Sequence, residues 1–245
     1  AYPDTPRVDA HDKVRGAALF AADDARAEML HGYFAVAPIG KGRIKALDAR
    51  AARAMAGVRL VLTHADMAGI KPGGFLMGGG FAFQSFQPML ADTIAYRGQP
   101  IALVIADTIE IARDAADRIV ATYAAEPIQV TLDAPAQDIV GQAGSPLPKP
   151  MFADRVAGDA DAAYAAAPIQ IDISCASPPQ HQNPIELIAT VAEWREGTLI
   201  IREGSQNSGA VRAGLAQQLG IAPDKIEVRS PYCGGGFGQK NSLQM

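Results

Sequence analysis

The spacing of apolar and polar positions predicts short strands interrupted by a few helices. Residues 101–105 are a continuous apolar run, which is typical of a buried strand. The Asp107-x-x-Glu110 pattern that follows is a capping box, and small or apolar residues recur at helical spacing beyond it. Alanines on such a helix allow close approach to a sheet. The predicted buried stripe comprises Ala112, Ala115, Ala116, Ile119, Val120 and Tyr123.

The sequence around this unit predicts further strands and one short helix, separated by turn-forming residues. Asp48 can cap the helix and Gly57 can end it, after an extended lead-in over residues 1–30. Strands mixed with helices, without regular strand–helix alternation, indicate an α+β fold. The predicted elements are strands at 33–39 and 43–47 around a hairpin-like turn at 40–42, a helix at 49–56, and strands at 58–63 and 128–132.

A change in composition divides the chain. Residues 133–150 are rich in alanine, glycine, glutamine and proline, which predicts a linker across the domain surface. We therefore expect one domain at 1–132 and the first part of a second at 151–245. The elements predicted in the early part of that second domain are a short helix within 154–167, a strand at 169–175, and a hairpin of 189–194 with 198–202.

The last forty residues carry the strongest functional signal. A polar loop at 204–208 leads into an amphipathic helix that Gly220 ends. A short strand at 226–228 then delivers the chain to a glycine-rich stretch at 234–240, where four glycines in five residues let the backbone approach a ligand closely. The apolar positions of the predicted helix are Val211, Leu215, Ala216 and Leu219.

Common ligands of glycine-rich loops do not fit this one. A phosphate-binding P-loop has glycine directly before its lysine, whereas Gln239 precedes Lys240 here. The dinucleotide fingerprint G-x-G-x-x-G fails as well, because the spacing after Gly236 is different. A second glycine cluster at 73–80 lacks the preceding strand and polar loop, so we expect a packing or mobile loop there.

Composition excludes several classes of function. The chain has 245 residues, 49% of them hydrophobic, and a formal charge of −4 without any basic run, which argues against a nucleic-acid partner. No apolar run is long enough to span a membrane, and the N-terminus has no secretory-signal pattern. The two cysteines are too few for an iron–sulfur cluster or a disulfide framework.

Four motifs in order resemble the molybdenum-binding large subunit of the xanthine dehydrogenase and aldehyde oxidase family. They are VRGAALFAADD (14–24), YRGQPIALVIADTIEIARDAADRIVATYAAEP (96–127), QHQNPIELIATVAEW (180–194), and SQNSGAVRAGLAQQLGI with IEVRSPYCGGGFGQK (205–221 and 226–240). The resemblance covers nearly the whole chain. It implies an a/b hammerhead domain followed by the start of a molybdopterin-binding domain.

The resemblance also implies a chemistry. Molybdenum would be held by the dithiolene of a molybdopterin, in its cytosine dinucleotide form, so that no protein side chain ligates the metal. The reaction would be oxidation of an aldehyde to a carboxylic acid with water as the oxygen source. Electrons would leave through 2Fe-2S and FAD partner chains. The general base, a glutamate, is expected outside this segment, because the family places it near the far end of a longer subunit.

Residues of this chain match the family's cofactor-contacting positions. Gln206 matches the glutamine whose amide approaches the apical oxo ligand, and Gly235, Gly236, Phe237 and Gly238 match the loop over the metal ligands. The alternatives are an exposed residue near a helix cap for Gln206 and a core residue for Phe237.

Three other residues near these motifs carry hypotheses of their own. Asn241 matches a substrate-pocket position that is glutamate in purine-oxidising members, which puts a xanthine substrate in doubt. We interpret Glu186 as structural. Cys233 is either a buried small hydrophobe or a redox-sensitive thiol.

The implied partners extend beyond the chain. The sequence stops five residues after the glycine-rich stretch without a closing element, so we expect the remainder of the subunit, or a second polypeptide, to complete the domain. The compartment would be cytoplasmic, or periplasmic by export with a partner. Two alternatives stay open: hydroxylation of N-heterocyclic aromatics, and a non-catalytic assembly or binding subunit of the same fold.

Overall fold

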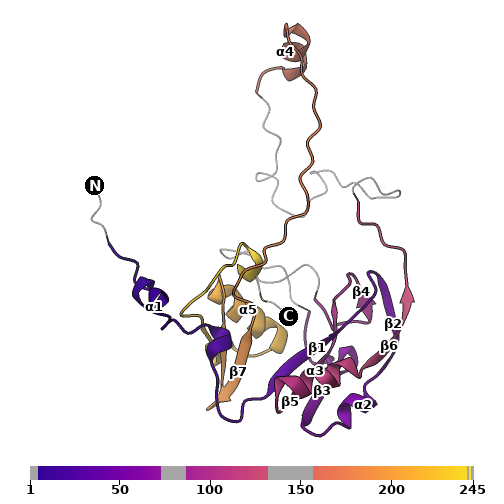
Figure 1. Ribbon diagram of the computed structural model, residues 1–245, viewed down its shortest axis with the longest axis vertical. Coiled ribbons are helices and arrows are strands. Elements are labelled where there is room, and N and C mark those ends of the chain that lie inside the picture. Colours follow the sequence, from indigo (N-terminus) through magenta and orange to yellow (C-terminus); the bar gives the residue numbers. More distant parts are fainter. Residues whose placement is uncertain (1–4, 73–86, 132–156, 242, 244–245) are drawn as a thin grey trace. The chain divides into compact units, whose positions relative to one another are not determined.

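A computed structural model describes residues 5–72, 87–131, 157–241 and 243. The chain forms two compact units, one of Ala1–Ile128 with Gln182–Met245 and the other of Gln129–His181 (Figure 1). The glycine cluster predicted as a packing loop at 73–80 and the linker predicted at 133–150 lie outside the described residues.

The first sheet of the larger unit has the strand order β1-β5-β3 and is antiparallel throughout. Helix α3 (Ile109–Asp117) packs on all three strands (Figure 1). Its alanines fit closely against the sheet because they carry no side chain beyond Cβ, and the core around them combines small residues with Val61, Ile101 and Val104. The strands are β1 (His31–Val36), β3 (Val58–Thr63) and β5 (Pro100–Ala106). The fully buried residues are Ala102, Val104, Ala106, Ala112 and Ala115.

A second small sheet contains β4 (Thr93–Ile94), β2 (Gly42–Asp48) and β6 (Val120–Ala125) in that order. The predicted hairpin across 40–42 is therefore wrong, because β1 and β2 belong to different sheets. Gly42, the first residue of β2, stands where a side chain would not fit. Its φ is +142°, and a Cβ there would lie 2.1 Å from the carbonyl oxygen of Ala124.

The predicted helix after residue 107 forms but is shorter than expected. It ends at Asp117, and the Val120 and Tyr123 assigned to its buried stripe lie on β6 instead. Its N-cap is Thr108, whose hydroxyl accepts the Ile111 N–H at 3.3 Å. Asp107 does not cap; it pairs with Arg59 at 2.6 Å.

Two other short elements differ from expectation. The helix predicted at 49–56 is the single turn α2 (Arg50–Arg53), and Asp48 accepts the Arg50 N–H at 3.0 Å. The strand predicted at 128–132 does not form over its described residues 128–131. Ile128 and Val130 are exposed there, so this stretch does not bury the apolar face on which the prediction relied.

The elements predicted in the C-terminal part are confirmed. Strands β7 (Thr190–Arg195) and β8 (Thr198–Glu203) form the predicted hairpin, and helix α5 (Ser208–Leu219) ends at Gly220 with a φ of +66°. Strand β9 (Ile226–Arg229) lies parallel to β8, which makes β8, α5 and β9 a crossover unit. Its core contains Leu199, Ile201, Ala216 and Ile226, with Leu215 and Val228 packed against them.

The expected lead-in contains helix α1 (Ala10–Val14) and a 3₁₀ turn, Ala21–Asp23. Other 3₁₀ turns are His64–Asp66, Pro223–Lys225 and Gln239–Asn241. Among the described residues, no helix is both long and apolar enough to cross a bilayer.

The smaller unit contains helix α4 (Ala160–Ala166), capped by Asp159, which accepts the Ala162 N–H at 2.9 Å. The strand predicted at 169–175 does not form. Its alternating isoleucines, Ile169, Ile171 and Ile173, are 78%, 72% and 74% exposed. The alternation of apolar and polar residues is typical of a strand with one buried face. A strand also requires a hydrogen-bonded neighbour, and the described residues supply none for this stretch.

Candidate cofactor-binding site

The parallel pairing of β8 and β9 brings two loops to one edge of the sheet. Residues 204–207 follow the end of β8, and residues 230–238 follow the end of β9. Ligands of sheets with parallel strands bind preferentially outside the carboxyl ends of those strands. The two stretches that the sequence marks as functional therefore meet at an edge suited to binding.

Gln206 is held between the two loops. Its backbone N–H donates to the Lys240 carbonyl at 2.8 Å, and its side-chain Oε1 accepts the Gly238 N–H at 3.1 Å. Because a backbone N–H can only donate, this contact identifies the amide oxygen and leaves Nε2 as the end that can donate to a ligand. The residue is exposed and directly precedes Asn207, the N-cap of α5.

Glycine at position 236 allows this close approach of the Gln206 side chain. A Cβ on Gly236 would lie 2.3 Å from Oε1 of Gln206, which is closer than any real contact. Phe237 follows in a left-handed conformation, with a φ of +48°, and Gly238 has a φ of +87°. A non-glycine residue in this region stores backbone strain, and such strain concentrates at functional sites.

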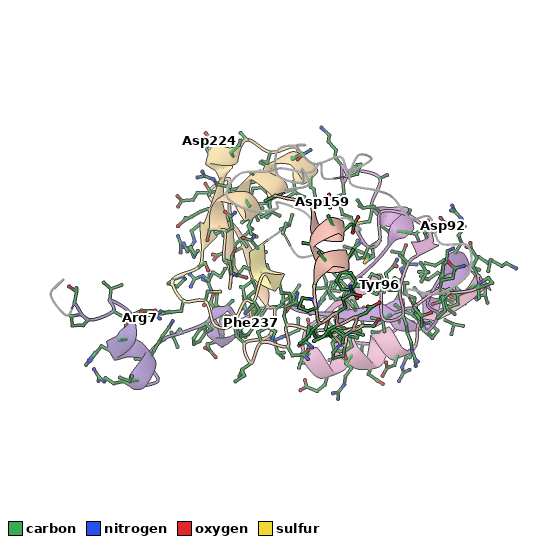
Figure 2. All side chains as sticks on the ribbon, turned by 90° about the horizontal axis from the view of Figure 1, so that it is seen from above. Arg7, Asp92, Tyr96, Asp159, Asp224 and Phe237 are labelled. Carbon is green, nitrogen blue, oxygen red and sulfur yellow. The ribbon has the colours of Figure 1, made fainter. Side chains whose placement is uncertain are left out.

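Phe237 is 73% exposed, so the alternative that it is a core residue is wrong (Figure 2). The backbone beside it is also available. Among the described residues, the N–H groups of Gly235, Gly236 and Phe237 have no hydrogen-bond partner. Successive unpaired N–H groups form an environment that favours anionic oxygen.

An ion pair anchors the glycine-rich loop from behind. Lys240 Nζ donates to the carboxylate of Glu186 and, at 3.0 Å, to the Glu186 carbonyl. Glu186 Oε2 also accepts the Gly234 N–H at 2.6 Å. The side chains of Lys240 and Glu186 are only 1% and 12% exposed. These contacts agree with the structural interpretation of Glu186, whereas the partner lysine was missed because it lies 54 residues away in sequence.

Serine hydroxyls join the same loops. Ser205 N–H donates to Ser230 Oγ at 3.0 Å, and the Asn207 N–H donates to Ser205 Oγ at 2.9 Å. Asn207 then caps α5 by accepting the Ala210 N–H at 3.0 Å. The polar loop after β8 is thus fixed at both ends, by the neighbouring loop and by the helix.

Two family models match the chain. Residues 15–127 match "Aldehyde oxidase and xanthine dehydrogenase, a/b hammerhead domain", and residues 146–245 match "Molybdopterin cofactor-binding domain". The chain belongs to the xanthine dehydrogenase and aldehyde oxidase family. The resemblance inferred from the motifs is confirmed, and so is the α+β fold with a hammerhead part before a molybdopterin-binding part.

The relatives in this family are oxidoreductases with different substrates. The aldehyde oxidoreductase molybdenum-binding subunit PaoC of Escherichia coli (strain K12) is 31% identical over 244 residues, which cover 97% of this chain and 31% of the relative. The nicotine 6-hydroxylase large subunit of Paenarthrobacter nicotinovorans is 32% identical, with coverage of 86% and 26%. Quinoline 2-oxidoreductase from Pseudomonas putida 86 is a solved structure with a TM-score of 0.80 and 26% identity, covering 98% of this chain and 31% of that one.

The chain thus spans about a third of the length of the curated relative PaoC. Family membership alone leaves the substrate class open, because the names of these relatives include both an aldehyde oxidoreductase and N-heterocycle oxidoreductases.

The residues at the strand edge fit the cofactor of this family. An amide nitrogen and unpaired backbone N–H groups can donate to oxygen atoms without competing as metal ligands. The donor set therefore suits hydrogen bonding to oxygen atoms of a molybdopterin.

Cys233 and Asn241 flank this donor set. Burial raises the pKa of the Cys233 thiol, and the nearby Glu186 carboxylate raises it further. A raised pKa disfavours the reactive thiolate, which favours the buried-hydrophobe interpretation. Asn241 is half-buried at the end of a 3₁₀ turn, and its N–H donates to the Gly238 carbonyl at 3.4 Å.

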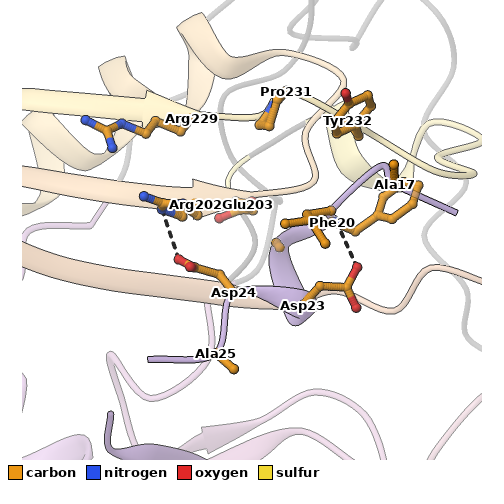
Figure 3. A pocket seen from close by; sticks show the side chains of 12 residues that line it. Ala17, Phe20, Asp23, Asp24, Ala25, Arg202, Glu203, Arg229, Pro231 and Tyr232 are labelled. Carbon is orange, nitrogen blue, oxygen red and sulfur yellow. Dashed lines mark hydrogen bonds and ion pairs between the residues drawn. The ribbon is translucent and has the colours of Figure 1, made fainter. Parts of the chain in front are cut away.

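A pocket of about 470 Å³ lies beside the end of β8 (Figure 3). Phe20 and Tyr232 line it with ring centroids 6.2 Å apart, and Arg202 pairs with Asp24 at 2.9 Å. Burial raises the pKa of the Glu203 carboxyl, although the Thr190 hydroxyl donates to it at 3.0 Å. Nothing in the sequence pattern marked Glu203, because its burial depends on residues distant in sequence, such as Thr190, that the fold brings beside it.

Proposed function

We propose that the chain carries part of the molybdenum-cofactor site of an enzyme that oxidises aldehydes to carboxylic acids, with water as the oxygen source. The observation that supports it most is the joint placement of the Gln206 amide and the Gly235–Phe237 N–H groups beside the carboxyl ends of two parallel strands. When bound, the cofactor supplies the oxygen-transfer and two-electron redox chemistry.

Gln206 orients the reacting oxygen in this proposal. Its Oε1 is occupied by the Gly238 N–H, so Nε2 is the donor, and its position is set by the loop that it contacts. A neutral donor stabilises an oxygen on which charge develops without adding a charge of its own. The chain thereby contributes orientation, which is what a protein adds to a cofactor that performs the bond changes.

The glycine-rich loop binds by its backbone. Gly235 and Gly236 carry no side chain, and the Phe237 ring is exposed, so N–H groups at this edge can face anionic oxygens of the cofactor directly. We assign Gly238 a supporting part, because its N–H fixes the Gln206 amide.

Aldehydes are the favoured substrates because the motifs QHQNPIEL and SPYCGGGFG resemble those of aldehyde oxidoreductases, and the chain is 31% identical to such a subunit. Asn241 is neutral where purine-oxidising members have a glutamate, which argues against a xanthine substrate only. N-heterocyclic aromatics are the alternative, supported by the likeness to nicotine 6-hydroxylase and quinoline 2-oxidoreductase. The general base, the cytosine dinucleotide form of the pterin and the 2Fe-2S and FAD partner chains remain expectations for the parts of the complex outside this chain.

Metal analysis and a substrate panel test the proposal. The full-length protein, purified natively with its co-purifying chains, is expected to contain about one molybdenum and about four irons per assembly. Turnover of aromatic and aliphatic aldehydes should then exceed turnover of nicotine, quinoline and hypoxanthine. A folded complex without molybdenum would overturn the enzyme assignment, and a preference for the heterocycles would overturn only the aldehyde assignment.

A further inference from the structure

We propose that Glu186 and Lys240 form a positioning pair that fixes the location of Gln206 for turnover; this inference rests on the proposed function. Neither side chain belongs to the donor set at the strand edge. Their influence passes through the backbone of the glycine-rich loop, so both residues act through Gln206 rather than on the substrate.

The burial of the pair is the first observation. Lys240 is the largest fully buried side chain among the described residues, and its charge meets only Glu186. Removing two charges from water costs about as much as their attraction returns, so an apolar pair of similar size would stabilise a fold equally well. Stability alone therefore does not account for a lysine and a glutamate here, whereas directional contacts do.

The contacts connect three segments of the chain. The Glu186 carboxylate holds the first glycine of the loop through the Gly234 N–H at 2.6 Å and holds the end of the loop through Lys240 Nζ. The Lys240 carbonyl in turn accepts the Gln206 N–H at 2.8 Å. A displacement of the Lys240 side chain would therefore also move the Lys240 carbonyl, which accepts the hydrogen bond from the Gln206 backbone.

The space around Glu186 is shaped for its side chain. A Cβ on Gly204 would lie 2.6 Å from Glu186 Oε1, and a Cβ on Gly234 would lie 2.7 Å from Glu186 Cβ. Both loops thus use glycine where they pass the glutamate, one after β8 and one after β9. The carboxylate lies between the two loops whose relative position defines the donor set.

The pair can be tested with two single variants and their combination. Lys240→Met and Glu186→Gln each leave one buried group without its charged partner, and both should lower the thermal midpoint of the full-length complex. The double variant removes both charges at nearly constant volume, and the amide oxygen introduced at position 186 would still accept the Gly234 N–H. We expect it to regain most of the thermal midpoint and of the bound molybdenum. The matched control is Lys41→Met with Glu126→Gln, an exposed pair at 3.4 Å in the hammerhead part.

Turnover separates positioning from a structural role. In the double variant we expect kcat per bound molybdenum to fall about 10- to 100-fold, because a displacement of about 1 Å is costly for a reacting geometry. KM should stay within about twofold, and the control pair should change neither quantity. Amide hydrogen exchange in peptides covering 204–207 and 232–241 should accelerate in the double variant, with or without bound cofactor.

Two results would overturn the inference. One is a double variant with wild-type kcat per molybdenum and unchanged exchange at both loops. The other is a loss of activity that merely follows the loss of molybdenum, since that describes a structural pair. A wild-type complex that lacks molybdenum would instead contradict the proposed function, and the exchange measurement would still test whether the pair fixes the loops.

Discussion

The hammerhead part and the loops at the strand edge hold their shapes by different means. Around α3 the fully buried residues are small and apolar, such as Ala102, Val104 and Ala115. At the strand edge the fully buried side chain is Lys240, and the contacts are hydrogen bonds that backbone N–H groups donate to side-chain oxygens of Glu186, Ser205 and Ser230. Apolar packing is non-directional, whereas a hydrogen bond fixes both distance and angle.

This difference matches the tasks of the two regions. The core between a sheet and an alanine-rich helix must be filled to a constant volume, and many combinations of apolar side chains can do so. A donor set that must meet oxygen atoms needs each N–H in a defined place. Substitutions should therefore affect stability in the first region and turnover in the second.

The largest effect should come from Gln206→Ala. The side chain is exposed and contributes one hydrogen bond, so assembly and molybdenum content should remain those of the wild type. Turnover should fall about 10²- to 10³-fold, the usual loss when one preorganised donor is removed. The measurement is kcat per bound molybdenum in the full-length complex.

The control for Gln206→Ala is Gln217→Ala, an exposed glutamine on α5, which should behave as the wild type. Full activity in Gln206→Ala would remove this residue from the site.

Ala115→Leu should have the opposite profile. Ala115 is fully buried between α3 and the sheet, so the larger side chain should lower the free energy of unfolding by about 1–3 kcal/mol. Thermal unfolding of the complex measures this loss, and kcat of the folded fraction should not change. Arg113→Leu, exposed on the same helix, should cost less than about 0.5 kcal/mol. A large loss of kcat in Ala115→Leu would contradict the expectation that substitutions in the hammerhead part affect stability and not turnover.

Gly236→Ala tests how the loops approach each other. The new Cβ would lie 2.3 Å from Gln206 Oε1, and the flexible amide would have to move away. We expect a loss of about 1 kcal/mol in stability, because the displaced amide loses its hydrogen bond, and roughly a tenfold lower kcat, smaller than for Gln206→Ala. Gly209→Ala is the control, because the nearest atom to its Cβ would be 3.6 Å away. Equal kcat in both variants would contradict the close approach.

The smallest effect concerns pH. Burial raises the pKa of Glu203 in the folded chain, so the folded state binds this proton more tightly than the unfolded state. The group therefore stabilises the fold below its unfolded pKa, and that contribution is lost as pH rises from about 4 through the raised value. The Glu203→Gln variant keeps an oxygen that accepts the Thr190 hydroxyl but has no carboxyl group to titrate. Its thermal midpoint should exceed that of the wild type at neutral pH and converge with it toward pH 4; parallel curves would contradict the assignment.

Much of the fold could be predicted because its signals are local. Helix α5 has apolar spacing and a terminal glycine, and the β7–β8 hairpin has a two-residue turn at Glu196 and Gly197. Errors arose where a local pattern is ambiguous. The alanine-rich run to Tyr123 reads as one helix, yet its last part becomes β6, because β2 provides a neighbouring strand.

The candidate site could be predicted in part. Gln206 and Gly236 stood out because their residue types and order match the family motifs, and the structure brings them together. The supporting contacts could not be predicted. Glu186 and Lys240 are 54 residues apart, and a pairing over that distance depends on three loops meeting in space. Residue types alone do not specify which acidic side chain pairs with which buried basic side chain.

The exposed ring of Phe237 has a consequence for how this surface tolerates change. A library randomised at positions 234–238 should accept many unbranched side chains at Phe237, since the ring is 73% exposed and only the left-handed backbone restricts the choice. The neighbouring Gly234 and Gly236 should tolerate less, because a Cβ at either position would lie within 3 Å of a side chain that holds the loop. The largest and most conspicuous residue of the motif is thus expected to be the most replaceable, and sequence drift there would not signal a change of activity.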